Sequence, residues 1–581
     1  MAWLSSNFTY RKEITVTNNS GGTLTDHCVR ITLNADTFDF TKAKSDGSDL
    51  RVTTSDGTTA AKHWKEKPYD NTGEYARFWF KATLTTGANT FYLYYGYASA
   101  TDADDPDNVF SYFNALEDSA DLAALNITDG TTTWSAVTDS ASPTGFAING
   151  TNGASTQASK GVLATLPAHY IAEMHVYNTG ATDALGAYAG SEVNRADVDN
   201  FYRAGGRVTT DGVNAGYVGK WTAGSGAATW FASASGQSMV AGVYDRQVTT
   251  WSPELSFDGT GVLSVSAMVG ATGTSPQCMV YDSGSDQLYV CSSQYIARYT
   301  RGGTKTEEVD YSTLSGTSWS GITIKDGNIY AIRYGSTAYV YEISTAGSLP
   351  TAGSITLHGS VVNDTTGSVG GGLLWTGTHF LTSENSASAG TIFRVLTDAL
   401  ASVKSIRMST ADPVIGPQGM FLKDGILYIP QHNGDLSLSS WDNVTLEYET
   451  FLYTDTGIAD FQGMCWNETD SFWYMAERTT DDLLERTISL ESTTKLIHSH
   501  LRSPTDAWSS PHLYKQVTSP YTQDEIGIGH GRSSRFAQMH VRPWTLVEPT
   551  KVLGAEQTAA ALLLTQHIRN FNKGLTGGMQ G

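Results

Sequence analysis

Apolar and polar positions alternate along most of the chain. In "YRKEITVTN" Ile14 and Val16 fall on one face of an extended segment, and "YARFWFKATL" repeats this pattern with Phe78 and Phe80. A period of two places successive side chains on opposite faces of a strand, so both segments predict half-buried strands. The Asp-Gly pairs of "KAKSDGSDLRVTTSDGT", between them, are typical of tight turns. We therefore expect an antiparallel β-sandwich at the start of the chain.

A second alternating region begins after residue 110. In "HYIAEMHVYN", Tyr170, Ala172, Met174 and Val176 fall on one face. This region resembles the start of a concanavalin-like jelly roll, and "DEIGIGHGRSSRFAQMHVRPWTLVEPTKVLGAEQ" near the other end of the chain is similar to the closing hairpin of that family. The resemblance implies a jelly roll with a long insertion, which sandwiches tolerate at exposed loop tips. A serial order of separate domains is the alternative.

The region between these segments repeats one pattern five times. The copies read "SPQCMVYDSGSDQLYV", "SWSGITIKDGNIYAI", "VGGGLLWTGTHFLTS", "GPQGMFLKDGILYIP" and "DFQGMCWNETDSFWYMA". Aligned on Cys278, Gly321, Gly372, Gly419 and Gly463, they are spaced by 43, 51, 47 and 44 residues. Two further strand patterns follow each copy, and four strands per repeat at this period predict a β-propeller of five blades. Packed blades bury one another's faces, and small residues at the start of each copy fit the crowding near the axis.

The pattern changes again after Gly554. "GAEQTAAALLLTQHIRNFNKG" has no proline, and its apolar residues recur at 3-4-3 spacing, which predicts a helix over 556–571. Its stripe consists of Ala561, Leu564, Ile568 and Phe571. The stripe either packs on the protein's own sandwich or docks onto another chain, because so short a helix is marginal alone. We expect docking and a homo-oligomer.

Together these patterns predict an all-β, multidomain chain with a short C-terminal α-helix. The expected ranges are 1–110 for the N-terminal β-sandwich, 111–272 for the first part of the jelly roll, 273–497 for the five-bladed β-propeller, 498–553 for the closing strands of the jelly roll and 554–581 for the helix and tail.

Composition and charge narrow the function classes. The 581 residues include 58 Gly, 29 Tyr and 14 Trp, and only 16% are charged, which is typical of many short strands joined by tight turns. A formal net charge of −21 without a basic cluster argues against nucleic acid or an anionic membrane surface as a partner. No apolar run reaches membrane-spanning length. The four cysteines are scattered without metal-type spacing, which predicts free thiols.

The first 110 residues also resemble a known family. The order Trp3, "YRK", "FDFTKAKSDGSDLRV" and "FYLYYGYASATDADDPDNVF" is similar to an uncharacterised β-sandwich domain with a YLYYG-type final strand. Such domains occur at the front of bacterial surface proteins and phage tail proteins, commonly before a concanavalin-like sandwich, and no catalytic residues are established for them. Bacterial members usually follow a signal peptide. Because the domain here begins at Met1, the resemblance implies a phage virion protein, made and assembled in the host cytoplasm.

Residues next to the repeat starts are the candidate ligand contacts. Those directly before the starts are expected at the mouth of the propeller channel, where glutamines can hydrogen-bond a neutral ligand such as a sugar. The alternative is that these amides are satisfied by water and by one another. Two tryptophans beside the starts are expected either to stack on sugar rings or to belong to the core between blades. The candidate residues are Gln277, Ser320, Gln418, Gln462, Trp319 and Trp466.

No common catalytic motif is present. The chain lacks a P-loop, H-E-x-x-H and a G-x-S-x-G nucleophile turn. A glycosidase would need paired carboxylates, for which Asp412 and Asp460 are the candidates. His498, His500 and His512 lack convincing metal spacing. The "DADDPDN" run offers oxygen ligands for Ca²⁺ but also fits a solvated linker. We therefore expect no catalytic residues, no metal and no cofactor, with Ca²⁺ as the one alternative.

The leading hypothesis is a non-enzymatic virion protein of a bacteriophage. It would form part of a tail tip, a fibre or a capsid appendage, contact other virion proteins and present its domains to host-surface glycans. One alternative is a polysaccharide-degrading glycosidase of the propeller type, and another is a purely structural decoration protein.

Overall fold

A computed structural model describes most of the chain. The described residues are 2–129, 132–151, 157–178, 187–197, 200–208, 215–221, 229–235, 244–264, 276–316, 318–362, 368–386, 390–409, 419–431, 434–443, 446–479, 482–502, 508–517, 525–531, 533–545 and 547–559.

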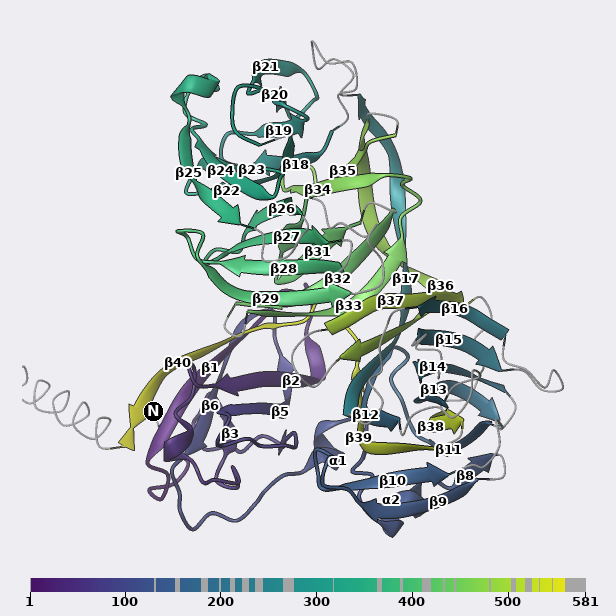
Figure 1. Ribbon diagram of the computed structural model, residues 1–581. Coiled ribbons are helices and arrows are strands. Elements are labelled where there is room, and N and C mark those ends of the chain that lie inside the picture. Colours follow the sequence, from purple (N-terminus) through teal and green to yellow (C-terminus); the bar gives the residue numbers. More distant parts are fainter. Residues whose placement is uncertain are drawn as a thin grey trace, which may run out of the picture. The chain divides into compact units, whose positions relative to one another are not determined.

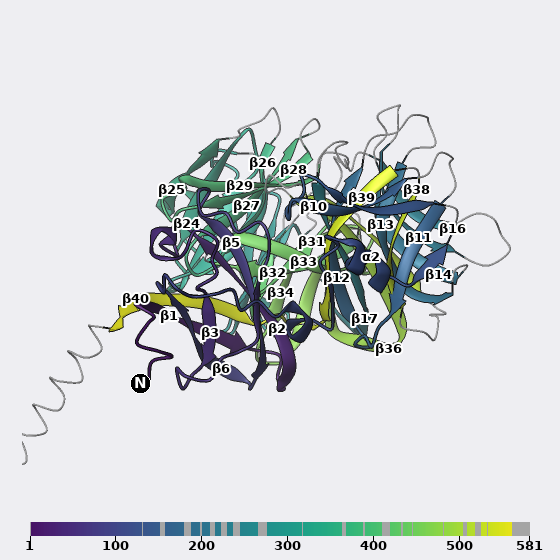
Figure 2. The same ribbon diagram turned by 90° about the horizontal axis from the view of Figure 1, so that it is seen from below.

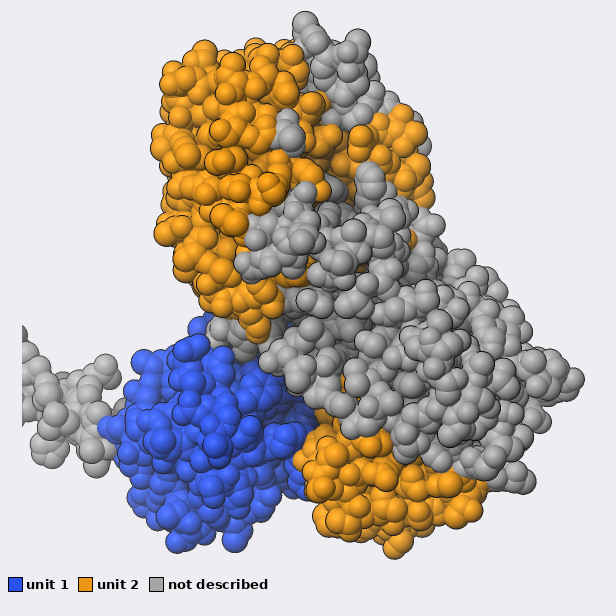
Figure 3. Space-filling model, in the orientation of Figure 1, with its two compact units in different colours: residues 1–114, 540–581 blue, residues 115–539 orange. Residues whose placement is uncertain are grey.

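The chain forms two compact units (Figure 3). Unit 1 comprises 1–114 and 540–581, and unit 2 comprises 115–539. Both consist almost entirely of antiparallel sheets, as the alternating pattern predicts (Figure 1). The helices among the described residues are short, with α1 at Pro106–Val109 and α2 at Ser119–Ala124. No helix in this part of the chain is long and apolar enough to cross a membrane.

Unit 1 is a sandwich of two sheets. One sheet has the order β3-β6-β1-β40 and the other the order β2-β5-β4. Ile14, Val16, Phe78 and Phe80 are all buried in the core between the sheets, as the period-two pattern predicts. The strands are β1 (Tyr10–Asn18), β2 (Leu24–Asn34), β3 (Arg51–Thr54), β4 (His63–Lys65), β5 (Tyr75–Leu84), β6 (Gly87–Tyr95) and β40 (Thr550–Thr558).

The place of β40 corrects two predictions. The segment 550–553 was expected to close the jelly roll, but β40 pairs with β1 of the N-terminal sandwich, from Tyr10↔Thr558 to Thr17↔Thr550. A helix was expected from residue 556, but residues 556–558 continue this strand because the free edge of β1 supplies partners for their backbone groups. The remainder of the predicted helix, from residue 560 on, lies outside the described residues.

Unit 2 contains a two-sheet jelly roll. Seven strands form one sheet, in the order β16-β15-β14-β13-β38-β11-β8. The opposing sheet contains β17-β12-β39-β10-β9. Tyr170, Ala172 and Met174 pair with Trp251, Thr249 and Gln247 of β17, and the hydroxyl of Thr249 lies 2.6 Å from that of Ser191 in the other sheet. The predicted face of this strand therefore points into the sandwich. The strands are β8 (Ile127–Asp129), β9 (Thr133–Thr138), β10 (Phe146–Thr151), β11 (Gln157–Leu163), β12 (Tyr170–Asn178), β13 (Ala187–Asp197), β14 (Asn200–Val208), β15 (Ala215–Trp221), β16 (Thr229–Ser235), β17 (Tyr244–Ser264), β38 (Glu525–Gly531) and β39 (Ser533–Pro543).

Four of the predicted blades are separate four-stranded sheets. Each has its strands in sequence order: β18-β19-β20-β21, β22-β23-β24-β25, β26-β27-β28-β29 and β30-β31-β32-β33. Their strands are β18 (Cys278–Asp282), β19 (Gln287–Ser292), β20 (Tyr295–Thr300), β21 (Lys305–Asp310), β22 (Trp319–Lys325), β23 (Asn328–Arg333), β24 (Thr337–Ile343), β25 (Thr356–Val362), β26 (Ser368–Trp375), β27 (Phe380–Ser386), β28 (Gly390–Leu396), β29 (Ser402–Ser409), β30 (Phe421–Lys423), β31 (Ile426–Pro430), β32 (Asp435–Asp442) and β33 (Glu447–Asp455).

The fifth blade is completed by a strand from before the first blade. Its order is β34 (Phe461–Asn467), β35 (Phe472–Glu477), β36 (Asp482–Arg502) and then β17. Leu255 to Ser264 of β17 pair with the first half of β36, while Arg246 to Pro253 pair with the second half, where β17 also pairs with β12 of the jelly roll. Two strands of 21 residues thus run side by side from the jelly roll into the propeller (Figures 1 and 2). The insertion is confirmed, and these strands are its two ends.

Separate apolar cores join neighbouring blades. Ile322 and Val280 share a core between blades 1 and 2, and Leu373 packs with blade 2 residues between blades 2 and 3. Leu381 and Leu427 share a core between blades 3 and 4. Cys465 of blade 5 packs with blade 1, which closes the ring. This arrangement confirms the prediction that the blades bury one another's faces.

Candidate functional site

The first strands of the blades meet near the propeller axis at the predicted glycines. A Cβ atom on Gly321 would lie 2.1 Å from the backbone nitrogen of Leu373 in the next blade. A Cβ atom on Gly463 would lie 3.2 Å from Cα of Gly419 and 3.5 Å from Cα of Cys278. The hydrogen bond from Met464 N to Gly419 O, 3.3 Å long, joins blades 5 and 4 directly. Small residues stand at these positions because backbones of neighbouring blades are in contact there.

Bulges displace the residue just before two of these glycines. In blade 2, Trp319 pairs with Arg333 and Gly321 with Ile332, so Ser320 is an extra residue without a partner in the register. In blade 5 the register shifts in the same way between Phe461 and Gly463. Gln462 is the extra residue there. Such bulges re-aim a side chain, and they are common next to functional sites.

Polar residues also occupy the facing ends of the second strands. They lie at the end of the propeller where the first strands begin, which we call the mouth. In blades 1, 2 and 5 they directly follow the partner of the repeat start. They are Ser292, Arg333, Glu384, Gln431 and Glu477. The first four are 0–2% exposed, which is unusual for polar side chains. The repeated sequence pattern does not reveal this tier, because it marks only the residues before the repeat starts.

Three of the predicted ligand contacts lie at the mouth. Gln277 is half-buried, and its backbone N–H donates to the carbonyl of Cys291 at 2.8 Å. Ser320 and Gln462 are buried, and the amide of Gln462 donates to the carboxylate of Asp460. Gln418 lies outside the described residues.

The two candidate tryptophans do not share a site. Trp319 is fully buried in the core between blades 1 and 2, edge-on to Tyr311 at 5.6 Å and under the guanidinium of Arg333. The hypothesis that it stacks on a sugar is therefore wrong, and the alternative of an inter-blade core residue holds. Trp466 is half-buried near the far end of its strand, packed on Trp473 at 5.1 Å. It lies away from the mouth because it follows Gly463 along the strand.

The charged groups at the mouth have partners within the protein. Glu384 accepts hydrogen bonds of 2.8 and 2.6 Å from Nε and Nη2 of Arg394, and both side chains are almost fully buried. Arg333 donates to the carbonyls of Tyr311 and Gly316. It thereby fixes the loop before blade 2.

The carboxylates proposed for a glycosidase are not paired by the structure. Asp460 accepts from Gln462 and lies 3.9 Å from Nε of Arg478. Asp412 lies outside the described residues. Of the two carboxylates predicted for hydrolysis, the structure therefore describes only Asp460.

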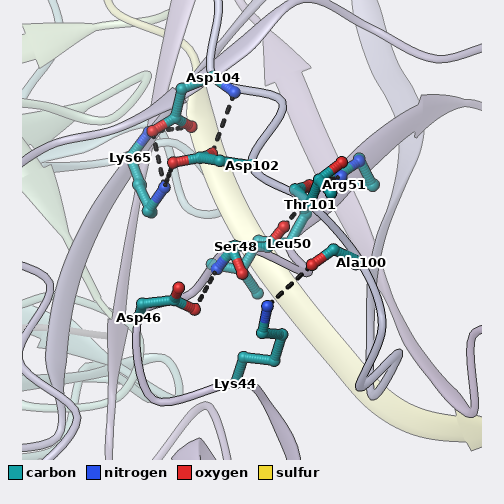
Figure 4. Close-up of polar contacts among 10 residues, drawn as sticks. All are labelled: Lys44, Asp46, Ser48, Leu50, Arg51, Lys65, Ala100, Thr101, Asp102 and Asp104. Atoms are coloured by element: carbon teal, nitrogen blue, oxygen red, sulfur yellow. Dashed lines mark hydrogen bonds and ion pairs between the residues drawn. The ribbon is translucent and has the colours of Figure 1, made fainter.

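In unit 1 two lysines pair with the acidic run. The ammonium group of Lys65 lies 2.7 Å from Asp102 and 2.8 Å from Asp104 (Figure 4). Lys62 lies 2.7 Å from Asp105. The backbone also takes part, since Asp105 N donates to His63 O at 2.8 Å. Burial alone would lower the pKa of Lys65, but the carboxylates of Asp104 and Asp102 outweigh burial and raise that pKa. The run thus lies along the edge of β4, where Lys62 and Lys65 pair with its carboxylates.

The "KAKSDGSDLRV" motif fixes the same segment from the other side. Asp49 is fully buried, and its carboxylate accepts from the backbone N–H groups of Lys44, Gly96 and Tyr97. Lys44 donates to the carbonyl of Ala100 at 2.8 Å (Figure 4). The motif therefore has a structural role, namely to hold the chain that follows the YLYYG strand.

A buried ionic cluster lies elsewhere in unit 1. Glu548 lies 2.7 Å from Arg542 and 3.4 Å from His27. Burial alone would raise the pKa of Glu548, but Arg542 and His27 outweigh it and hold that pKa well below its usual range. All four cysteines are buried with free thiols, and burial raises the pKa of Cys28 to about 12. Such thiols are inert.

Metal ligation and the docking stripe find no support in the described part of the chain. Among these residues no group of three or more His, Cys, Asp and Glu side chains could hold a metal ion. The side chains of His498, His500 and His512 lie outside the description. The same holds for the predicted docking stripe of Ala561, Leu564, Ile568 and Phe571.

These features define a sandwich unit joined in one chain to a jelly roll that carries an inserted five-bladed propeller. Residues 46–137 match the family model of a domain of unknown function, DUF2341. This match confirms an uncharacterised domain in the N-terminal part of the chain. The match covers only a small part of the whole chain. No curated protein matches the chain.

Solved structures resemble parts of the chain at low identity. Glutaminyl cyclase of Myxococcus xanthus is 11% identical over 42% of this chain and 100% of that one, with a TM-score of 0.32. A protein of unknown function from Bacteroides caccae is 11% identical over 39% and 83%, with a TM-score of 0.27. A putative oxidoreductase (glucose dehydrogenase) from Thermus thermophilus is 12% identical over 39% and 99%, also at 0.27. Because these TM-scores are low, the propeller is identified only from the arrangement of its own five sheets.

Proposed function

We propose that the protein is a non-enzymatic component of a bacteriophage virion that binds host-surface glycans at the mouth of its propeller. The observation that carries the glycan part is the gathering of amide and hydroxyl groups there, with Gln277, Ser320 and Gln462 directly before the repeat starts and Ser292 and Gln431 at the ends of second strands. Groups of this kind hydrogen-bond the hydroxyls of sugars. The virion part rests on the resemblance of the first 110 residues.

The carboxylates at the mouth favour binding over hydrolysis. A glycosidase needs one carboxyl group as acid and a second as base or nucleophile on either side of the scissile bond. Glu384 is buried and bonded twice to Arg394, and Asp460 is bonded to Gln462. Glu477, the third carboxylate there, accepts from the backbone N–H of Ala459. Carboxylates held in this way serve structure better than proton transfer.

Incubation with bacterial capsule and lipopolysaccharide tests this function. We expect the protein to retain polysaccharide without shortening it, as measured by co-sedimentation and by the size distribution of the sugar chains. Release of oligosaccharides would instead identify a depolymerase. If the protein neither retains nor shortens the polysaccharide, the remaining hypothesis is a purely structural decoration protein. Antibody labelling of phage particles tests the virion assignment separately.

A further inference from the structure

We infer that the glycan contact is an uncharged arc of the mouth, formed by blades 5, 1 and 2, and that it selects neutral sugars over acidic ones. This inference rests on the proposed function and adds the ligand's charge class and the contact residues. The arc consists of Gln462, Gln277, Ser292 and Ser320. Blade 5 packs on blade 1 and blade 1 on blade 2, so the four residues come from three consecutive blades.

Ser292 distinguishes this arc from an ordinary polar rim. Its side chain is 0% exposed, and its hydroxyl oxygen has no hydrogen-bond partner among the described residues. Burying a hydroxyl without a partner costs free energy, so such groups in native proteins call for an explanation. A ligand hydroxyl that reaches Ser292 would supply the missing bond.

The direction of Ser292 follows from the strand register. Cys278 pairs with Cys291, and both side chains belong to the core between blades 1 and 2. Side chains alternate along a strand, so Ser292, which follows Cys291 in β19, points to the opposite side of blade 1, toward blade 5. Gln277 is half-buried and stands beside it at the mouth, where its backbone N–H donates to the carbonyl of Cys291. A sugar bound at Gln277 therefore lies next to the strand end that carries the serine hydroxyl.

Charge at the same end of the propeller selects against acidic sugars. Asp460 and Glu477 both lie at the mouth in blade 5, next to Gln462. A uronate or phosphate group entering the arc would approach these carboxylates in a protein with a formal net charge of −21. The guanidinium of Arg333 does not offset them, because it is buried and donates to two backbone carbonyls. Arg478 lies 3.9 Å from Asp460 and offsets one of the two carboxylates, so one negative charge remains at this place. Like charges repel, and the repulsion grows as salt is lowered.

Two variants of the full chain separate ligand binding from folding. Ser292→Ala removes the hydroxyl at the mouth, while Tyr289→Phe removes another buried hydroxyl without a partner from the same strand. Tyr289 belongs to the core between blades 1 and 2, so its hydroxyl lies on the other side of the blade. Neither change breaks a hydrogen bond of the protein, so we expect both variants to melt at or above the temperature of the unmodified protein.

The probe is the polysaccharide retained in the assay above, cut into fragments and separated into neutral and acidic fractions. We expect neutral fragments to bind, with affinity about three- to tenfold lower for Ser292→Ala and unchanged for Tyr289→Phe. Equal or stronger binding of the acidic fraction at low salt would overturn the inference, as would a Ser292→Ala variant with full affinity. In both cases retention itself would persist, so the proposed function would stand. If the unmodified protein retained no polysaccharide, the proposed function would fail together with the inference.

Discussion

The hydroxyl of Tyr95 donates a 2.6 Å hydrogen bond to the carboxylate of Glu556, a residue 461 positions further along the chain. Tyr95 ends the YLYYG strand β6, and Glu556 belongs to β40, the last described strand. Lys42 lies 2.6 Å from the same carboxylate. The C-terminal segment is therefore part of the N-terminal sandwich.

Replacing Tyr95 should weaken this attachment. In Tyr95→Phe the buried ring remains but the bond to a charged acceptor is lost, so we expect the free energy of unfolding of unit 1 to fall by about 1–2 kcal/mol. Urea denaturation followed by tryptophan fluorescence measures it. Tyr10→Phe is the matched control, because the Tyr10 ring stacks on Tyr95 at 5.5 Å and its hydroxyl makes no hydrogen bond to any of the described residues. Equal stability of the two variants would contradict the structural role of Glu556.

Truncation tests the strand as a whole. A chain that ends at Pro549 loses β40 and exposes the backbone groups of β1, so its N-terminal unit should melt at a lower temperature and aggregate through the open edge. A chain that ends at Ala559 keeps the strand and should melt like the full chain. Scanning calorimetry of both chains checks this. Identical melting of the two would show that β40 adds nothing to the sandwich.

His63 should make unit 1 sensitive to acid. Its ring is buried on Phe78, and its Nδ1 faces the carbonyl of Ala61. Burial is the main reason that its pKa falls from 6.5 to about 4, and Arg51 and Lys65 lower it further while Asp102 opposes them. The unfolded chain takes up the proton first, so stability is complete above pH 6.5 and is lost as the pH falls toward 4.

The expected loss is about 3.5 kcal/mol, from 2.5 pH units at about 1.4 kcal/mol each. Urea midpoints between pH 7 and 4 measure it. His63→Phe keeps a ring against Phe78 but cannot titrate, so its stability should fall less over this range. A variant that follows the same pH curve as the unmodified protein would assign the acid sensitivity to other groups.

The buried pair of Glu384 and Arg394 should be costly to break from one side. Glu384→Gln leaves a buried guanidinium without its counter-charge, so we expect a loss of about 3–5 kcal/mol in propeller stability. Replacing both residues, with Glu384→Leu and Arg394→Met, should lose clearly less than the sum of the single changes. Calorimetry of the unmodified protein, the Glu384→Leu and Arg394→Met single variants and the double variant gives the coupling energy. Additive losses would mean that the pair does not act as a unit.

Glycine at the propeller axis should not tolerate a methyl group. In Gly321→Ala the new Cβ atom meets backbone of the next blade, so we expect a loss of at least about 2 kcal/mol. Gly353→Ala, where nothing lies within 4 Å, should change stability little. The two melting temperatures decide the comparison. A stable Gly321→Ala protein would show that the blades can move apart at the axis.

The five-bladed repeat could be predicted because each copy carries the same local pattern of apolar, polar and small residues. Spacing and small residues at Gly321 and Gly463 indicated five blades meeting at an axis, and period-two alternation at Ile14 and Phe78 indicated the faces of the first sandwich. The sheet that β40 joins could not be predicted in this way. Its pairing depends on a free edge at β1 that no residue within 551–558 reveals, and the Ala/Leu-rich sequence that follows suggested a helix instead.

Some of the candidate ligand residues could likewise be predicted from the sequence, and others could not. The sequence placed Gln277, Ser320 and Gln462 at one end of the propeller by counting from the repeat starts. It did not find Ser292 or Glu384, because these residues reach the mouth through cross-strand pairing. For Trp319, which an inter-blade core surrounds, burial could be decided only by the packing of two blades.

The paired strands β17 and β36 have a mechanical consequence. Because each backbone continues from the jelly roll into blade 5, a pull on the propeller is carried by two covalent chains side by side rather than by a flexible linker. For a force along the strands, the hydrogen bonds that hold β17 on β12 and β36 on β35 lie across the direction of pull, so they resist it together. The propeller is thus joined stiffly to the jelly roll, and a load along these strands passes directly from one domain to the other.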